Sequence, residues 1–233
     1  MYRIAVPGVF LVTLSLGGCG LIDPDITQFN LSLPDQEFTI DTSQWGLSGD
    51  AQFPSIPCDP QNDLCEQLTD AVCSGNECAG SCDVESMTCK VTVSVALSEP
   101  INLVEEKPEL QTIQNQPFLE VTIDEVAYEV SENTLNFASP VVNLYVAPQN
   151  IMSPDSAEAR LVGTIGSVPA MQPQSWSAME LTSVGEGNLR EMMGDYRSVF
   201  NVIVGSTVEI TAGMPMPSGR AVATVAVDAH AGL

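Results

Sequence analysis

The chain has 233 residues and carries 30 Asp and Glu residues against 7 Lys and Arg, a formal net charge of −23 at pH 7. This acidity excludes nucleic acid as a partner, because binding phosphates requires a basic face. It also argues against an electrostatic attachment to anionic lipid. The apolar fraction of 44% is too high for a disordered chain, so we expect one substantial core with an appended module.

Residues 1–18 have the dimensions of a secretory signal peptide. One basic residue, Arg3, precedes an apolar run from Ile4 to Leu16, and two glycines follow. The run is too short to span about 30 Å of hydrocarbon as a helix. Its removal would leave 215 residues with 6 Lys and Arg against 30 Asp and Glu, because the leader contains Arg3 and no acidic residue. We therefore expect an exported, even more acidic mature chain.

The end of this leader, Leu16-Gly17-Gly18-Cys19, resembles the lipobox of bacterial lipoproteins. The resemblance implies cleavage before Cys19, a diacylglycerol on its sulfur, and usually a fatty acid on the new amino group. Two or three acyl chains anchor a protein stably where one would not. Because Gly20 rather than Asp follows, the sorting rule of enteric bacteria favours the outer membrane over the inner membrane. The alternative is an ordinary signal peptide that releases a soluble protein.

All six remaining cysteines lie in residues 58–89, which contain few large apolar residues, so covalent cross-links are needed to make this module rigid. Their spacings include no CxxC pair, and the single histidine, His230, is distant in sequence, so three disulfides are favoured over a zinc site. The even number left after Cys19 agrees with complete pairing, but the sequence leaves fifteen pairings open. The six are Cys58, Cys65, Cys73, Cys78, Cys82 and Cys89.

Strand patterns flank this module on both sides. A tether, residues 19–27, leads to alternating apolar residues, so residues 28–57 are predicted to form strands that pack on the main domain of residues 90–233. A short helix is expected at about 63–72, and another beginning near Asn188, with Glu191 completing a capping box. The strands expected after the module are residues 91–97, 118–130, 141–146, 161–165, 175–181, 202–204, 208–210 and 220–227.

Short strands separated by polar turns predict a mostly β protein, an antiparallel β-sandwich of seven to nine strands with one short helix and a small disulfide-rich insert. An Ig-like or jelly-roll-like arrangement is favoured, and a small barrel is the alternative. The residues expected in its core are Val91, Val93, Val95, Val121, Ile123, Leu144, Val202, Val204 and Val225.

The apolar positions change parity at Asp124-Glu125, which predicts a β-bulge there. These neighbouring carboxylates could act as an acid–base pair in hydrolysis, whereas a charged bulge that discourages edge pairing is the simpler interpretation. His230 is expected at an exposed strand end rather than as a catalytic base. With no second histidine and no GxSxG sequence, a serine triad lacks support.

A weak calcium-loop register begins at Asp59. Four residues fall at ligand positions of such a loop, namely Asp59 at position 1, Gln61 at position 3, Asp63 at position 5 and Asp70 at position 12. However, position 6 is Leu64, where an EF-hand needs Gly, and position 12 is not Glu. The simpler interpretation is a solvated acidic surface. We therefore expect no metal or cofactor apart from the lipid on Cys19.

Together these features predict a lipid-anchored envelope protein that binds, adheres or assembles without catalysis. Its acyl chains would contact the membrane, and its partner would be an envelope protein or polysaccharide. The alternative is an envelope-polymer hydrolase that uses the Asp124–Glu125 pair. A sandwich fold does not by itself identify either role.

Overall fold

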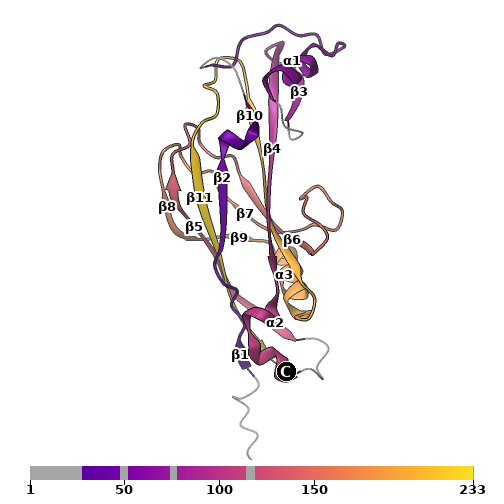
Figure 1. The fold of residues 1–233 in the computed structure, drawn as a ribbon, viewed down its shortest axis with the longest axis vertical. Helices are drawn as coiled ribbons and strands as arrows, with labels where there is room; N and C mark the ends of the chain where they lie inside the picture. Colours follow the sequence, from indigo (N-terminus) through magenta and orange to yellow (C-terminus); the bar gives the residue numbers. More distant parts are fainter. Residues whose placement is uncertain (1–27, 48–51, 74–77, 114–118, 233) are drawn as a thin grey trace, which may run out of the picture.

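The structure is a computed structural model that describes residues 28–47, 52–73, 78–113 and 119–232. Two antiparallel sheets pack face to face in an elongated molecule (Figure 1). The predicted mostly β, antiparallel sandwich is confirmed, with eleven strands in the described residues instead of seven to nine. Very short strands account for part of the difference, because two or three residues show no readable alternation.

The five-stranded sheet has the order β1-β11-β5-β8, and β2 also pairs with β11. β1 lies against one end of β11, where Gln28 is opposite Gly232, while β2 lies along the other end, where Asp41 is opposite Arg220. The strands are β1 (Gln28–Asn30), β2 (Gln36–Asp41), β5 (Glu120–Asn133), β8 (Gln174–Ala178) and β11 (Arg220–Gly232).

The six-stranded sheet has the order β3-β4-β10-β6-β7-β9. Its edge strand β3 comes from the cysteine-rich segment, and β4 continues from that segment into the sandwich without interruption. The boundary expected between residues 89 and 90 therefore falls inside β4. The strands are β3 (Cys78–Asp83), β4 (Thr88–Ile101), β6 (Val142–Pro148), β7 (Arg160–Ile165), β9 (Glu180–Leu181) and β10 (Phe200–Ile210).

Helix α1 (Leu64–Val72) forms where the sequence predicted it, and α2 (Leu103–Glu106) is a single turn. Two short 3-10 helices, η2 (Thr42–Trp45) and η3 (Pro108–Ile113), complete the helical elements of the described residues.

Helix α3 (Ser183–Gly194) starts earlier than expected. Its N-cap is Thr182, whose hydroxyl accepts a hydrogen bond from the Gly185 amide at 2.9 Å, so the capping box expected at Asn188 is wrong. Asn188 instead lies inside the helix and donates from Nδ2 to the Leu161 carbonyl at 2.9 Å. The first turn forms because Gly185 packs directly against the backbone of Val162 in β7, and tertiary packing of this kind overrides the low helix propensity of glycine.

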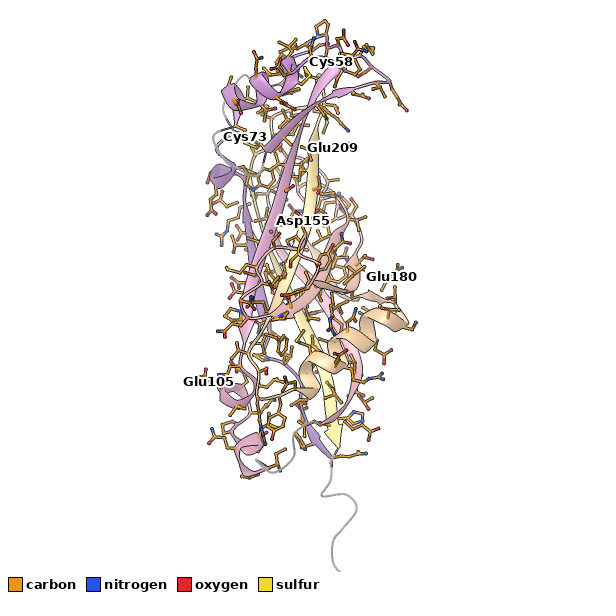
Figure 2. The ribbon with its side chains drawn as sticks, turned by 90° about the vertical axis from the view of Figure 1, so that its right-hand side faces the viewer. Cys58, Cys73, Glu105, Asp155, Glu180 and Glu209 are labelled. Atoms are coloured by element: carbon orange, nitrogen blue, oxygen red, sulfur yellow. A yellow bond between two sulfur atoms is a disulfide. The ribbon has the colours of Figure 1, made fainter. Side chains whose placement is uncertain are left out.

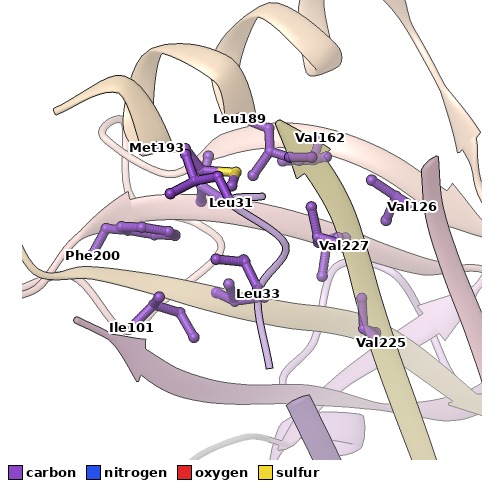
Figure 3. Close-up of a cluster of buried hydrophobic side chains, with 14 of the residues drawn as sticks. Leu31, Leu33, Ile101, Val126, Val162, Leu189, Met193, Phe200, Val225 and Val227 are labelled. Carbon is purple, nitrogen blue, oxygen red and sulfur yellow. The ribbon is translucent and has the colours of Figure 1, made fainter. Parts of the chain in front are cut away.

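The main core lies between the two sheets (Figure 3). Val225 and Val227 enter it from β11, Phe200 from β10, and Leu189 and Met193 from α3. Of the nine predicted core residues, Val91, Val93, Val121, Leu144, Val202, Val204 and Val225 are buried, while Val95 and Ile123 are only half-buried.

A second apolar cluster lies beneath the cysteine-rich segment. It consists of Phe53 with Val91 and Val93 from β4 and Val208 and Ile210 from β10. Val95 is half-buried because it stands at the junction, between Val93 in this cluster and Leu97, which packs against the main core. The cysteine-rich segment is thus attached to the sandwich by shared strands and a shared apolar layer.

The two ends of the molecule differ in structure. β1, with Gln28, lies at one end, and α1, β3 and the cysteines lie at the other (Figures 1 and 2). We call the cysteine-bearing end, residues 52–73 and 78–89, the stapled tip. Among the described residues, no helix is long and apolar enough to cross a membrane.

Candidate functional site

The six cysteines of the stapled tip form three disulfides, as predicted. Cys58 pairs with Cys82, Cys65 with Cys89, and Cys73 with Cys78, with Cα–Cα distances of 5.7, 5.3 and 6.4 Å. The first two join the loop at residue 58 and helix α1 to the β3–β4 hairpin, and the third closes the segment between α1 and β3. Cys19, the predicted lipidation site, and the signal peptide and tether of residues 1–27 lie outside the described residues.

The calcium register is interrupted by secondary structure. Leu64 to Asp70, which would supply the second half of a calcium loop, form most of α1 instead. Asp59 accepts a hydrogen bond from the Gln61 amide at 2.9 Å, as in a local turn. In the described part of the chain, the group of metal-ligating atoms that lies close together is the sulfurs of Cys58, Cys65 and Cys89, and disulfide bonds occupy all three.

The bulge predicted at Asp124-Glu125 is confirmed. In the β5–β11 ladder, Asp228 lies opposite Glu125 and Ala229 lies opposite Ile123, so Asp124 is the extra residue. Both carboxylates of the predicted pair are exposed. The bulge also places Glu125 directly opposite the like-charged Asp228, which is an unfavourable cross-strand pair.

His230 lies near the end of β11 and contacts the bulge. Its Nδ1 atom is 2.9 Å from Oδ2 of Asp124, and the two side chains are 40% and 50% exposed. Ser32 lines the same open pocket of about 400 Å³, but its hydroxyl accepts a hydrogen bond from the Ala229 amide at 3.3 Å. Among the described residues it has no hydrogen bond to His230, so the three groups do not form a linked triad.

A second pocket adjoins the first and shares Asp228 with it. Its lining also contains Asp35, Glu125 and Trp176, whose side chain on β8 is 47% exposed, and its volume is about 370 Å³. The outer face of the five-stranded sheet therefore carries an acidic, open surface around the bulge.

A larger hollow, which we call the sheet groove, lies on the outer face of the six-stranded sheet and has a volume of about 600 Å³. Its floor crosses three strands, where Gly205 of β10 is flanked in register by Ala96 of β4 and Asn143 of β6. Because these side chains are short, the floor lies below the loops on either side of it. The groove was not predicted from the sequence, where its one signal is a glycine inside a strand, which often marks a close approach of another segment.

One wall of the sheet groove is the loop of residues 149–159, which is fixed from below by Asn201. This side chain is only 3% exposed, and its Nδ2 donates to the carbonyls of Gln149 at 2.9 Å and Ile151 at 2.7 Å. Pro154 of the same loop rests on Gly205, where an added Cβ would lie 2.9 Å from the proline Cβ. The loop is therefore held against the sheet by both hydrogen bonds and packing.

The opposite wall is formed by Pro140 and Val141. The hydroxyl of Ser206 donates to the Val141 carbonyl at 2.9 Å, so this wall too is tied to β10. Two half-buried polar side chains face the space between the walls, Asn143 and Tyr145. Within the described residues, neither side chain has a hydrogen-bond partner.

The sequence matches no family model and no curated protein. Among solved structures, it is similar to a chain from the full particle of Israeli acute paralysis virus heated to 63 degrees, with 11% identity and a TM-score of 0.27 over 100% of this chain and 85% of that chain. A likeness at this TM-score carries no functional argument.

Proposed function

We propose that the protein is a bacterial envelope lipoprotein, acylated on Cys19, that presents its stapled tip away from the membrane and acts by binding rather than catalysis. The observation that carries this proposal is the placement of β1, which begins at Gln28, and of the cysteine-bearing elements α1 and β3 at opposite ends of the molecule (Figure 1). A lipid on Cys19 would hold the β1 end near the bilayer.

The lengths involved support this orientation. Eight residues separate Cys19 from Gln28, and the nine steps between the two reach at most about 32 Å when the chain is fully extended. The 13 residues of β11 alone extend about 40 Å at a rise of roughly 3.4 Å per residue, and β4 continues beyond them into the stapled tip. The body is therefore longer than its tether, which gives the tip access to partners farther from the membrane.

The sheet groove supports a binding role. Its two walls are fixed to β10 by Asn201 and Ser206. Binding of a ligand would therefore not carry the entropic cost of ordering the surface. The partner we propose is an envelope protein or polysaccharide, and the outer membrane is the favoured location because of Gly20.

The anchor is tested by the Cys19→Ala variant in a bacterial host with a lipoprotein pathway. We expect loss of labelled fatty acid from the protein and its transfer from the membrane fraction to the soluble fraction, because no acyl chain would then hold it. Gly20→Ala is the matched control and should stay acylated. If Cys19→Ala remained in washed outer membranes with unchanged label, the lipoprotein assignment would be wrong.

The second candidate function is an envelope-polymer hydrolase. The gathering of Asp124, Glu125 and Asp228 around the bulge, with His230 beside Asp124, favours it. The test is release of soluble fragments from dye-labelled peptidoglycan by the wild-type protein and by an Asp124→Asn, Glu125→Gln variant. Release that the variant lacks would establish the hydrolase and overturn the non-catalytic role.

A further inference from the structure

We infer that the sheet groove binds a neutral oligosaccharide. The inference deepens the binding role proposed above, on which it rests, and it does not depend on the lipid anchor. Three properties of the groove support it, namely its shape, the polar groups that face into it, and its charge.

The groove is a preformed cavity of the right size. Its volume of about 600 Å³ lies within the roughly 300–1,000 Å³ of typical small-molecule sites. Because Gly205 has no side chain, Pro154 can pack directly on the floor, and Pro154 and Val141 both line the groove. Buried Asn201 fixes the Pro154 wall, so the cavity does not need to form when a ligand arrives.

The polar groups of the groove can both donate and accept hydrogen bonds. The Asn143 amide and the Tyr145 hydroxyl lack partners in the described part of the chain, and the hydroxyls of Ser94 and Thr207 lie farther along the same surface. Amides and hydroxyls suit a ligand whose own hydroxyls donate and accept in turn. A sugar ring also has apolar C–H faces, which can pack against the ring of Tyr145 and against Pro154.

The charge of the groove selects a neutral ligand. Among the described side chains that line it, Asp155 carries the one carboxylate, and none is Lys, Arg or His. An anionic polymer would find no cation there and would be repelled by a strongly acidic protein. A polycation would find one carboxylate, whereas the bulge surface on the other sheet offers several.

A peptide strand fits the groove less well than a sugar. The backbone of Gly205 is already paired on both sides, with Ala96 and with Asn143. At Gly205 the floor therefore offers no unpaired main-chain groups, and a peptide could not add a strand there by main-chain hydrogen bonds.

The test is a titration of the full chain carrying Cys19→Ala, so that the protein is free of lipid, with maltohexaose, cellohexaose and chitohexaose. Saturation-transfer NMR detects binding and calorimetry gives Kd. We expect at least one hexasaccharide to bind, and an Asn143→Ala, Tyr145→Phe variant to bind it about tenfold or more weakly, because hydrogen bonds are lost. The Tyr145→Phe change keeps the ring, and unchanged thermal unfolding would show that the variant is folded.

Trp176→Ala is the matched control, since Trp176 lies exposed on the other sheet, and it should leave Kd unchanged. Loss of binding in Trp176→Ala but not in the groove variant would overturn the inference while keeping the binding role. Absence of binding by all three sugars would also overturn it. Either result is independent of the anchor, because the titrated protein carries no lipid.

Discussion

Cys82 and Cys89 lie directly opposite each other in the β3–β4 ladder, yet each is bonded to a cysteine outside the hairpin. Cys82 holds Cys58 of the preceding loop, and Cys89 holds Cys65 of α1. The hairpin therefore holds two separate segments, the loop at Cys58 and helix α1, through one disulfide each.

The two long-range disulfides should contribute more stability than the short one. Cys65 and Cys89 are 24 residues apart and Cys73 and Cys78 are 5 apart, so restricting the unfolded chain is worth about 3.5 kcal/mol for the first and about 2 kcal/mol for the second. We expect Cys65→Ala, Cys89→Ala to lower the free energy of unfolding more than Cys73→Ala, Cys78→Ala, as measured by urea denaturation. Equal losses would contradict this explanation.

Reduction of the wild-type protein should open the stapled tip before it unfolds the sandwich. Among the described residues, the main core contains no cysteine, so it keeps its own apolar contacts when the disulfides are lost. We expect dithiothreitol to expose six thiols in residues 58–89 and to allow proteolysis there, while the amides of β5 and β11 remain protected from hydrogen exchange. If the amides of β5 and β11 lost their protection at the same point at which residues 58–89 became sensitive to proteolysis, the stapled tip and the sandwich would unfold as one unit.

Two glycines of α3 provide a matched pair of substitutions. An added Cβ at Gly185 would collide with the backbone of Val162, whereas at Gly187 it would meet nothing within 4 Å. We expect Gly185→Ala to destabilise the protein by roughly 1–3 kcal/mol through overpacking. Gly187→Ala should stabilise it by about 0.5–1 kcal/mol through helix propensity. Thermal and urea unfolding of both variants measure the difference, and a similar effect at both positions would contradict the close packing of α3 on β7.

The loss of unfolding free energy on truncating a core side chain should be larger where the side chain is more deeply buried. Val93 is 1% exposed and belongs to the apolar cluster under the stapled tip, whereas Ile123 is half-buried beside the bulge. We expect Val93→Ala to cost roughly 2–3 kcal/mol of unfolding free energy, and Ile123→Ala to cost about 1 kcal/mol because part of its side chain is already in water. Changes below about 0.5 kcal/mol at both positions, measured by denaturant unfolding, would mean that the inward face is assigned wrongly.

Asp83 should make the β3–β4 turn sensitive to acid. Its carboxylate accepts hydrogen bonds from the Ser86 hydroxyl at 2.7 Å and the Glu85 amide at 3.1 Å, which lower the pKa of Asp83 below its ordinary value of 3.8. A lowered folded-state pKa means that its stabilising contribution is present above the unfolded-state pKa and is lost as pH falls through the folded one.

The Asp83→Asn variant tests this linkage. We expect it to be less stable than wild type at neutral pH, and we expect the gap to narrow at about pH 2, because the stabilising contribution of the Asp83 carboxylate is lost as the pH falls through its folded-state pKa. Urea unfolding at the two pH values measures the difference, and an NMR titration of the carboxyl carbon reports its pKa directly. A gap between the two proteins that persisted unchanged at low pH would contradict the assignment.

The features that could be predicted from the sequence are those that depend on neighbouring residues. The alternation through Val91 and Val93 located β4, and the change of parity at Asp124 located the bulge, because side chains alternate between the two faces of a strand. The start of α3 could not be predicted in this way, since Gly185 is helical owing to its contact with Val162 in another element.

The candidate site depended on residues that are far apart in sequence. The floor of the sheet groove joins Ala96, Asn143 and Gly205, and its wall depends on Asn201 reaching back to Gln149. Strand order sets these contacts, and nothing in the local pattern of any one segment specifies it. The pairing of the six cysteines was open for the same reason.

The attachment of β1 has a mechanical consequence. Its three residues pair with the end of β11, and the Leu31 and Leu33 amides extend the contact by donating to Ala229 and Val227, each at 2.9 Å. These strands run along the long axis (Figure 1), and their hydrogen bonds lie across it. If the stapled tip were held and Gln28 were pulled away from it along the long axis, the force would therefore act on all the hydrogen bonds between the β1 segment and β11 at once, in shear. It would not break them one after another. The disulfides would meanwhile keep residues 58–89 from lengthening, so the molecule is built to bear tension from end to end.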